Sequence, residues 1–103
     1  DRIFNADMVA APKPSPLLFL HAAKSCGFEG QHSIVIEDTA VGTLAGKAAN
    51  YFVYGFTGCV ADEHKSIEEA ALNNAKVDKI FNSFIHMTDD IIEEKSDSYR
   101  MSA

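Results

Sequence analysis

One short apolar run constrains the fold of this chain more than any other feature. Residues 33–36 read Ser-Ile-Val-Ile, and Glu37 and Asp38 follow directly, before Thr-Ala-Val-Gly. A β-branched run of this length predicts a strand that is buried on both faces of a parallel sheet. Ligands of open α/β sheets bind beyond the carboxyl ends of the strands. The two carboxylates therefore lie where such folds bind their ligands.

Glu37 and Asp38 form a candidate site for a hard cation. Mg²⁺ in phosphate-handling sites takes oxygen ligands and needs one or two carboxylates, with water and substrate oxygens completing its shell. Successive strand residues point to opposite faces, so we expect one carboxylate to bind the ion directly and the other to act indirectly. The alternative is that the pair only ends a strand at a polar loop, and the surrounding sequence decides between the two.

Three prolines surround a lysine upstream of this strand. Pro12, Pro14 and Pro16 restrict the backbone around Lys13. A restricted backbone loses less entropy when the lysine ammonium meets an anion, so we expect the loop to hold Lys13 in a fixed place. The alternative for a lone lysine is a solvated charge. A polyproline ligand is disfavoured, because prolines spaced by two do not give the P-x-x-P pattern.

The rest of the chain predicts alternating strands and helices, which is typical of an α/β fold with a doubly wound sheet. Residues 97–103 look like a frayed end. The expected strands are Ile3–Phe4, Ile34–Glu37, Tyr51–Phe56 and Val77–Phe81, and the expected helices are Pro16–Cys26, Ala40–Ala49, Ser66–Ala75 and Thr88–Glu94.

Capping residues bound these helices. Ser15 is the expected N-cap of the first helix, and Gly27 is its C-terminal stop. Thr39 is interpreted as an N-cap rather than a ligand, and Asn50 as the left-handed residue at the end of the second helix. Ser66, with a glutamate three residues later, predicts a capping box.

The segment around Gly42 and Gly46 looks like a phosphate-binding loop but does not match one. The two glycines enclose three residues where that loop has four, and Lys47 is followed by alanine instead of serine or threonine. We interpret both glycines as positions where a helix approaches the sheet.

Two segments together resemble a known family. Residues 13–16 (Lys-Pro-Ser-Pro) followed by Phe19, and residues 34–42 (Ile-Val-Ile-Glu-Asp-Thr-Ala-Val-Gly) with residues 45–50, resemble the third and fourth motifs of the haloacid dehalogenase (HAD) superfamily. The likeness is strongest with the β-phosphoglucomutase-like phosphatases and extends to about Glu94. It implies a partial three-layer, Rossmann-like core with a mostly parallel sheet, without the N-terminal strands and the cap domain.

The resemblance also implies roles for single residues. Lys13 would be the lysine of the third motif, which neutralises charge between a nucleophilic aspartate and the phosphoryl group. Asp38 would be the Mg²⁺-binding aspartate of the fourth motif, and Glu37 would be its partner, directly or through water. Positioned cations of this kind stabilise a phosphoryl group whose charge is spread over its oxygens.

The family's first motif, D-x-D, does not occur in these 103 residues. The chain begins at Asp1, and its opening segment resembles the middle of a HAD core. We therefore expect residues 1–103 to be the carboxyl-terminal portion of a single core domain, with the missing N-terminal part in the same polypeptide. The chain alone should have no turnover.

The composition of the chain limits the kinds of partner that it can bind. The net charge of −6 argues against a surface that binds nucleic acid. No apolar run approaches the roughly 18 residues of a membrane span, and no signal peptide is evident, so we expect no membrane partner and a cytoplasmic location. Cys26 and Cys59 lack a metal-binding spacing, and no disulfide is expected.

The resemblance predicts a Mg²⁺-dependent phosphatase or phosphomutase that acts on a small phosphorylated metabolite. A metal-free haloacid dehalogenase is the alternative within the superfamily, but its chemistry has no use for paired metal carboxylates. A non-catalytic, receiver-like α/β module is the alternative outside the enzymes. In a receiver the lysine follows the phosphorylated aspartate, whereas Lys13 precedes Asp38, and this order favours the HAD interpretation.

Overall fold

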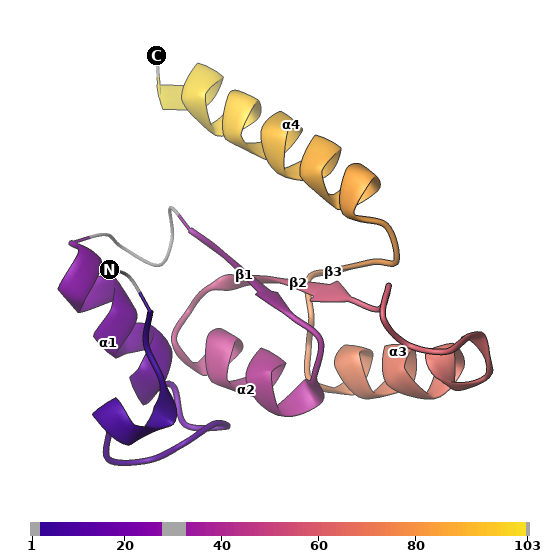
Figure 1. Cartoon of the computed structure of the whole chain (residues 1–103). Coiled ribbons are helices and arrows are strands. Elements are labelled where there is room, and N and C mark those ends of the chain that lie inside the picture. The colour runs from indigo at the N-terminus through magenta and orange to yellow at the C-terminus, as the bar shows by residue number, and fades with distance from the viewer. Residues whose placement is uncertain (1–2, 28–32, 103) are drawn as a thin grey trace.

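A three-stranded parallel sheet forms the centre of the molecule (Figure 1). The computed structural model describes residues 3–27 and 33–102. The strands β1 (Ile34–Glu37), β2 (Phe52–Phe56) and β3 (Lys79–Phe81) lie side by side in that order. Both strand pairs are parallel, and Glu37 at the end of β1 lies opposite Gly55 of β2. The carboxyl ends of all three strands therefore meet at one edge of the sheet.

Helices cover both faces of this sheet, so the expected three-layer α/β architecture is confirmed. In Figure 1 the shorter helices lie below the sheet and the longest helix lies above it. The helices below are α1 (Leu17–Cys26), α2 (Ala40–Ala48) and α3 (Lys65–Asn74), and the helix above is α4 (Phe84–Ser102). The described residues also form the 3-10 turns η1 (Ala6–Met8) and η3 (Asp62–His64). None of the described helices is long and apolar enough to cross a membrane.

The two sides of the sheet carry separate apolar clusters, because successive strand residues point to opposite faces. The cluster below the sheet is Val35, Ala49, Tyr51 and Val53, with Phe19, Ala23 and Val77 packed against it. The cluster under α4 is Tyr54, Phe56 and Met87, with Ile34, Phe81 and Ile91 packed against it. The core of this chain is thus divided by the sheet itself.

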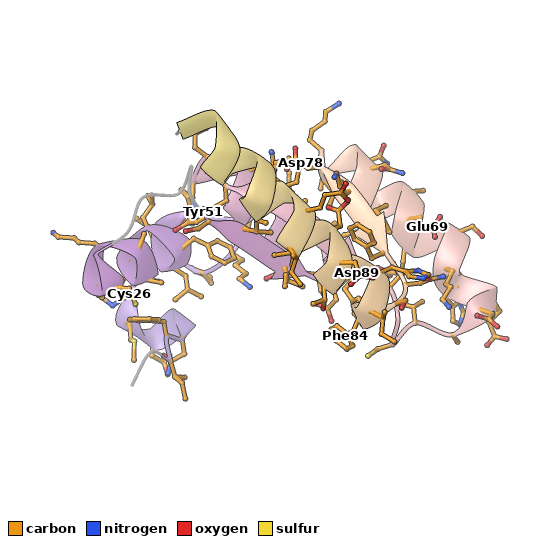
Figure 2. All side chains as sticks on the ribbon, turned by 90° about the horizontal axis from the view of Figure 1, so that it is seen from above. Cys26, Tyr51, Glu69, Asp78, Phe84 and Asp89 are labelled. Carbon is orange, nitrogen blue, oxygen red and sulfur yellow. The ribbon has the colours of Figure 1, made fainter. Side chains whose placement is uncertain are left out.

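A polar contact fastens α4 to the upper face, which Figure 2 views from above. The hydroxyl of the fully buried Tyr54 donates to the Asp90 carboxylate. Lys79 Nζ lies 3.1 Å from Asp90 Oδ1 and 3.0 Å from Oδ2. The hydrogen bond from Tyr54, together with Lys79, holds the pKa of Asp90 below its usual value despite some desolvation.

Three of the expected capping residues are confirmed. Gly27 ends α1 with a φ of 73°, and Asn50 has a φ of 66° after α2. Thr39 caps α2 in an extended conformation, and its Oγ1 accepts a hydrogen bond from the Gly42 N–H. Helix α1 begins at Leu17, one residue later than expected, while Ser15 Oγ accepts from the Leu17 N–H at 3.3 Å.

The expected strand at Ile3–Phe4 is wrong. These residues form no regular element, and Ile3 is exposed. Phe4 packs edge to face on His21 of α1, with ring centroids 5.5 Å apart. The segment therefore lies against α1, and it pairs with none of the described strands.

Strand β1 is also less buried than expected. Val35 is buried, but Ile36 on the opposite face is 48% exposed. Helix α4 covers β2 and β3 through Tyr54 and Phe81, and this leaves β1 partly open above.

The capping box at Ser66 is wrong as well. Helix α3 begins at Lys65, directly after the 3-10 turn η3, and His64 precedes it without a side-chain cap. Because the turn leads straight into the helix, Ser66 already has helical backbone and cannot serve as an N-cap. The expected end of this helix near Ala75 is confirmed.

Helix α4 starts at Phe84 and not at Thr88. Ser83 makes the earlier start possible, since its Oγ accepts from the His86 N–H at 3.4 Å. The earlier turn also carries Met87 into the core under α4. The helix includes the backbone of residues 97–102, and a frayed end there stays a prediction. Residue 103 lies outside the described residues.

Candidate active site

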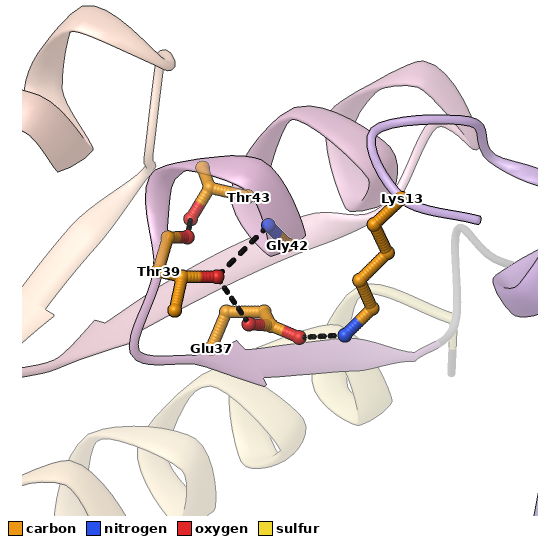
Figure 3. Close-up of polar contacts among 5 residues, drawn as sticks. All are labelled: Lys13, Glu37, Thr39, Gly42 and Thr43. Atoms are coloured by element: carbon orange, nitrogen blue, oxygen red, sulfur yellow. Dashed lines mark hydrogen bonds and ion pairs between the residues drawn. The ribbon is translucent and has the colours of Figure 1, made fainter. Parts of the chain in front are cut away.

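The structure brings Lys13 and Glu37 together at the carboxyl edge of the sheet (Figure 3). Lys13 Nζ lies 2.5 Å from Glu37 Oε2, although the two residues are 24 positions apart in the sequence. The Lys13 side chain is 31% exposed and the Glu37 side chain is 10% exposed. A charged pair with one nearly buried member is held more firmly than a pair on the open surface.

The loop before α1 presents Lys13 as the sequence predicts. Its prolines restrict the backbone, and the Ser15 N–H donates to the Pro12 carbonyl at 3.0 Å to close a turn around the lysine. Lys13 Nζ also lies 5.1 Å from the centroid of the Phe19 ring in α1. The ammonium is therefore placed by a turn, an aromatic ring and a carboxylate.

Thr39 contacts the second oxygen of Glu37. Its Oγ1 lies 3.3 Å from Glu37 Oε1 and accepts the Gly42 N–H at 3.0 Å. The Thr39 carbonyl accepts a hydrogen bond from Thr43 Oγ1 at 2.9 Å, which ties the first turn of α2 together. Each carboxylate oxygen of Glu37 thus has its own donor. Sequence reasoning found Thr39 as a cap but missed this second contact.

Asp38 follows the last residue of β1 and is exposed. No ion pair or hydrogen bond joins it to another described residue, so its oxygens are open to a ligand within this part of the chain. Among the described residues, no group of three or more acidic, histidine or cysteine side chains is arranged to hold a metal ion. Glu37 and Asp38 therefore supply at most a partial set of protein oxygens, which is what Mg²⁺ requires when water and substrate supply the rest.

A second lysine pair at the opposite edge of the sheet was not expected from the sequence. Lys47 Nζ lies 2.7 Å from Asp78 Oδ2, and the same oxygen accepts the N–H of buried Val53 at 2.7 Å. A surface hollow of about 300 Å³ lies at this edge and is lined by Lys47, Asn50, Tyr51 and Phe52. Burial, and then the neighbouring Cys26, raises the pKa of Tyr51. The Asp78 carboxylate at this edge is already used by the backbone.

Comparison with known proteins identifies the class of this fold. The family model of haloacid dehalogenase-like hydrolases matches residues 1–50, which contain Lys13, Glu37 and Asp38. A bifunctional riboflavin kinase/FMN phosphatase from Arabidopsis thaliana is 47% identical over 47 residues, which is 46% of this chain and 12% of that protein.

Solved structures agree with this assignment. A haloacid dehalogenase-like protein from Agrobacterium tumefaciens superposes with a TM-score of 0.72 at 27% identity, over 85% of this chain and 39% of that one. A putative β-phosphoglucomutase from Bacteroides vulgatus has a TM-score of 0.66 at 28% identity, over 80% of this chain and 31% of that one. These comparisons confirm the resemblance of this chain to the haloacid dehalogenase-like hydrolases and to their β-phosphoglucomutase-like members.

The chain is much shorter than these relatives. It spans between 9% and 20% of the length of the curated proteins it matches, and 39% of the Agrobacterium protein. The three-stranded sheet thus corresponds to one part of a larger HAD core.

Proposed function

We propose that the polypeptide carrying this chain is a Mg²⁺-dependent phosphoryl-transfer hydrolase, a phosphatase or phosphomutase acting on a small phosphorylated metabolite. The observation that carries the proposal is the ion pair of Lys13 with Glu37 beside Asp38, at the carboxyl end of β1. Two relatives, a bifunctional riboflavin kinase/FMN phosphatase and a putative β-phosphoglucomutase, support phosphoryl transfer as the chemistry.

Asp38 and Glu37 would hold the Mg²⁺ ion. Their donor chemistry fits, because both offer carboxylate oxygens and Asp38 has no competing partner among the described residues. When bound, the ion supplies positive charge that stabilises the transferring phosphoryl group. Lys13 supplies a second positive charge from the loop before α1. The turn that surrounds Lys13 keeps this charge in place, so it need not reorganise during the reaction.

The nucleophilic aspartate would come from a part of the same polypeptide outside this sequence. Strand β1 forms one edge of the described sheet. An apolar strand of a parallel sheet normally has a neighbouring strand on each side. A further strand beside β1 would place its carboxyl end next to Glu37 and Asp38. This chain alone would then turn over no phosphate ester. The net charge of −6 argues against nucleic acid as a partner, and the cytoplasm stays the predicted location.

The test is Asp38→Ala in the complete polypeptide, assayed with p-nitrophenyl phosphate and Mg²⁺. We expect hydrolysis to fall at least 100-fold, because the substitution removes a ligand of the charge-stabilising ion, while the far-UV circular dichroism stays unchanged. Asp62→Ala is the control, since the Asp62 side chain is 97% exposed and pairs with Lys65 on η3 and α3. Undiminished hydrolysis in Asp38→Ala rejects the assignment, and chloride release from a 2-chloro acid without Mg²⁺ would instead favour the dehalogenase.

A further inference from the structure

Two buried glycines one turn apart on α2 face different neighbours. Gly42 and Gly46 both lie on the side of the helix that meets the sheet. A Cβ built at Gly46 would lie 2.8 Å from Val53 Cγ2 and 3.5 Å from Val35 Cγ1. Gly46 therefore lets the helix approach the apolar core, as the sequence predicts for both glycines.

Gly42 has a different neighbour. A Cβ built there would overlap the Glu37 carboxylate, at its carbon and at both oxygens. The space left by the missing side chain is filled by this carboxylate, so no residue larger than glycine fits while Glu37 keeps its position. Gly42 also lets the helix approach the sheet, as expected, since Glu37 belongs to β1, but the group that it admits is charged and belongs to the site.

The carboxylate in this space is held on both sides. Lys13 Nζ contacts Oε2 at 2.5 Å, and Thr39 Oγ1 contacts Oε1 at 3.3 Å (Figure 3). Thr39 Oγ1 accepts from the Gly42 N–H at 3.0 Å, so its own proton is directed to Glu37. One residue of α2 thus provides the space, and its N–H orients the hydroxyl that contacts the carboxylate.

We propose that Gly42 and Thr39 are positioning residues that set the Mg²⁺ affinity of the site by fixing the Glu37 carboxylate. This inference rests on the proposed function, in which Glu37 takes part in holding the ion. A side chain at position 42 would turn the carboxylate away from its present position. Residues that orient a metal ligand in this way change metal affinity by about 10- to 100-fold when they are altered.

The experiment compares Gly42→Ala with Gly46→Ala in the complete polypeptide. Mg²⁺ affinity is measured by titration calorimetry, and the Mg²⁺ concentration at half-maximal p-nitrophenyl phosphate hydrolysis is measured in parallel. We expect Gly42→Ala to raise the Mg²⁺ dissociation constant about 10- to 100-fold. Gly46→Ala, whose Cβ would meet Val53, is expected to lower the melting temperature and to leave the dissociation constant within about twofold, since no metal ligand is displaced.

A double-substitution cycle separates positioning from general damage. Glu37→Asp shortens the side chain and withdraws the carboxylate from the space at Gly42. Gly42→Ala should therefore cost much less Mg²⁺ affinity in the Glu37→Asp background than in the wild type. Equal costs in both backgrounds, or a Gly42→Ala variant that binds Mg²⁺ as the wild type does, would overturn the proposal.

Thr39 gives an independent test if Gly42→Ala does not fold. Thr39→Ser keeps both the cap and the hydroxyl that contacts Glu37, whereas Thr39→Val loses them. We expect weaker Mg²⁺ binding for valine only, and equal binding by both variants contradicts the inference. If the wild-type polypeptide itself binds no Mg²⁺, the proposed function fails, and this outcome is distinct from failure of the positioning role.

Discussion

The two edges of the sheet each carry a lysine paired with a carboxylate, and the pairs differ in what the carboxylate does. Lys13 and Lys47 have the same side-chain exposure, 31%, and their Nζ atoms lie 2.5 and 2.7 Å from the partner oxygens. At the amino edge, Asp78 also accepts the Val53 N–H and so satisfies a backbone donor of β2. At the carboxyl edge, Glu37 accepts only from side chains, Lys13 and Thr39, in the contacts described.

This difference distinguishes a structural pair from a candidate catalytic one. A carboxylate that satisfies a buried N–H cannot leave without exposing an unpaired donor, so it is suited to a permanent role. A carboxylate held by side chains, beside an acidic neighbour such as Asp38 that has no partner among the described residues, can exchange a partner for a cation. Charge and exposure alone do not distinguish Lys13 from Lys47. The other contacts of their partner carboxylates, Glu37 and Asp78, do distinguish them.

The largest expected effect comes from replacing the two lysines in the complete polypeptide. Lys13→Met should lower the turnover of p-nitrophenyl phosphate about 10²- to 10³-fold, the usual effect of removing one positioned stabiliser of transition-state charge. Lys47→Met should leave turnover near the wild-type value and lower the melting temperature. Steady-state kinetics and thermal melts of both variants check this, and a wild-type rate for Lys13→Met would remove that residue from the site.

Smaller effects are expected from replacing Asp78 or Asp62, each of which pairs with a lysine. Asp78 is half-buried, whereas Asp62 is exposed. Asp78→Ala should cost about 1–3 kcal/mol of unfolding free energy, because the buried Val53 N–H loses its acceptor. Asp62→Ala breaks the Lys65 pair at 3.0 Å on the open surface and should cost less than about 1 kcal/mol. Urea denaturation followed by circular dichroism measures both, and equal costs would show that Asp78 is only a surface charge.

The smallest expected effect concerns another lysine–carboxylate pair, Lys79 with Asp90 under α4. The pKa of Asp90 is lowered in the folded state, chiefly by the hydrogen bond from Tyr54. A carboxyl with a lowered folded pKa contributes stability above its unfolded pKa, near 3.9, and this contribution is lost as the pH falls through the folded pKa. The unfolding free energy should therefore decrease on acidification below about pH 4.

Tyr54→Phe should reduce this acid dependence, because it removes the main cause of the shift. Tyr51→Phe is the matched control, since the Tyr51 hydroxyl contacts the Phe19 carbonyl at 3.4 Å and not a carboxylate. Urea denaturation of both variants at pH 3, 4 and 6 gives the slopes. An unchanged slope in Tyr54→Phe would mean that the contact with Asp90 does not control the acid sensitivity of α4.

Local sequence signals predicted much of the fold, because they depend on neighbouring residues. Thr39, Gly27 and Asn50 hold the expected positions at helix ends. The same local reasoning failed at Ser66, where a 3-10 turn extends the helix past the expected cap, and at α4, where Ser83 starts the helix earlier. In both cases the competing signal was also local, and at α4 the earlier start places Met87 in the core.

Contacts between residues far apart in the sequence could be predicted only through the family resemblance. The sequence pointed to Lys13, Glu37 and Asp38, yet nothing in the spacing of residues 13 and 37 fixes the contact between them. The contact requires that β1 ends where the turn before α1 delivers its lysine. The Asp78 contacts with Lys47 and Val53 were missed for the same reason, since they join residues 31 and 25 positions apart.

The amino-acid order by itself determined the strand that ends in two carboxylates, the rigid lysine loop and the capping of α2, because each follows from backbone preferences over a few residues. Tertiary structure alone decided that Glu37 turns toward Lys13, that Gly42 provides the space for its carboxylate and that Ile36 stays partly open. The physical reason is that steric exclusion and charge pairing act between groups that the fold brings together. Their sequence separation carries no record of that proximity.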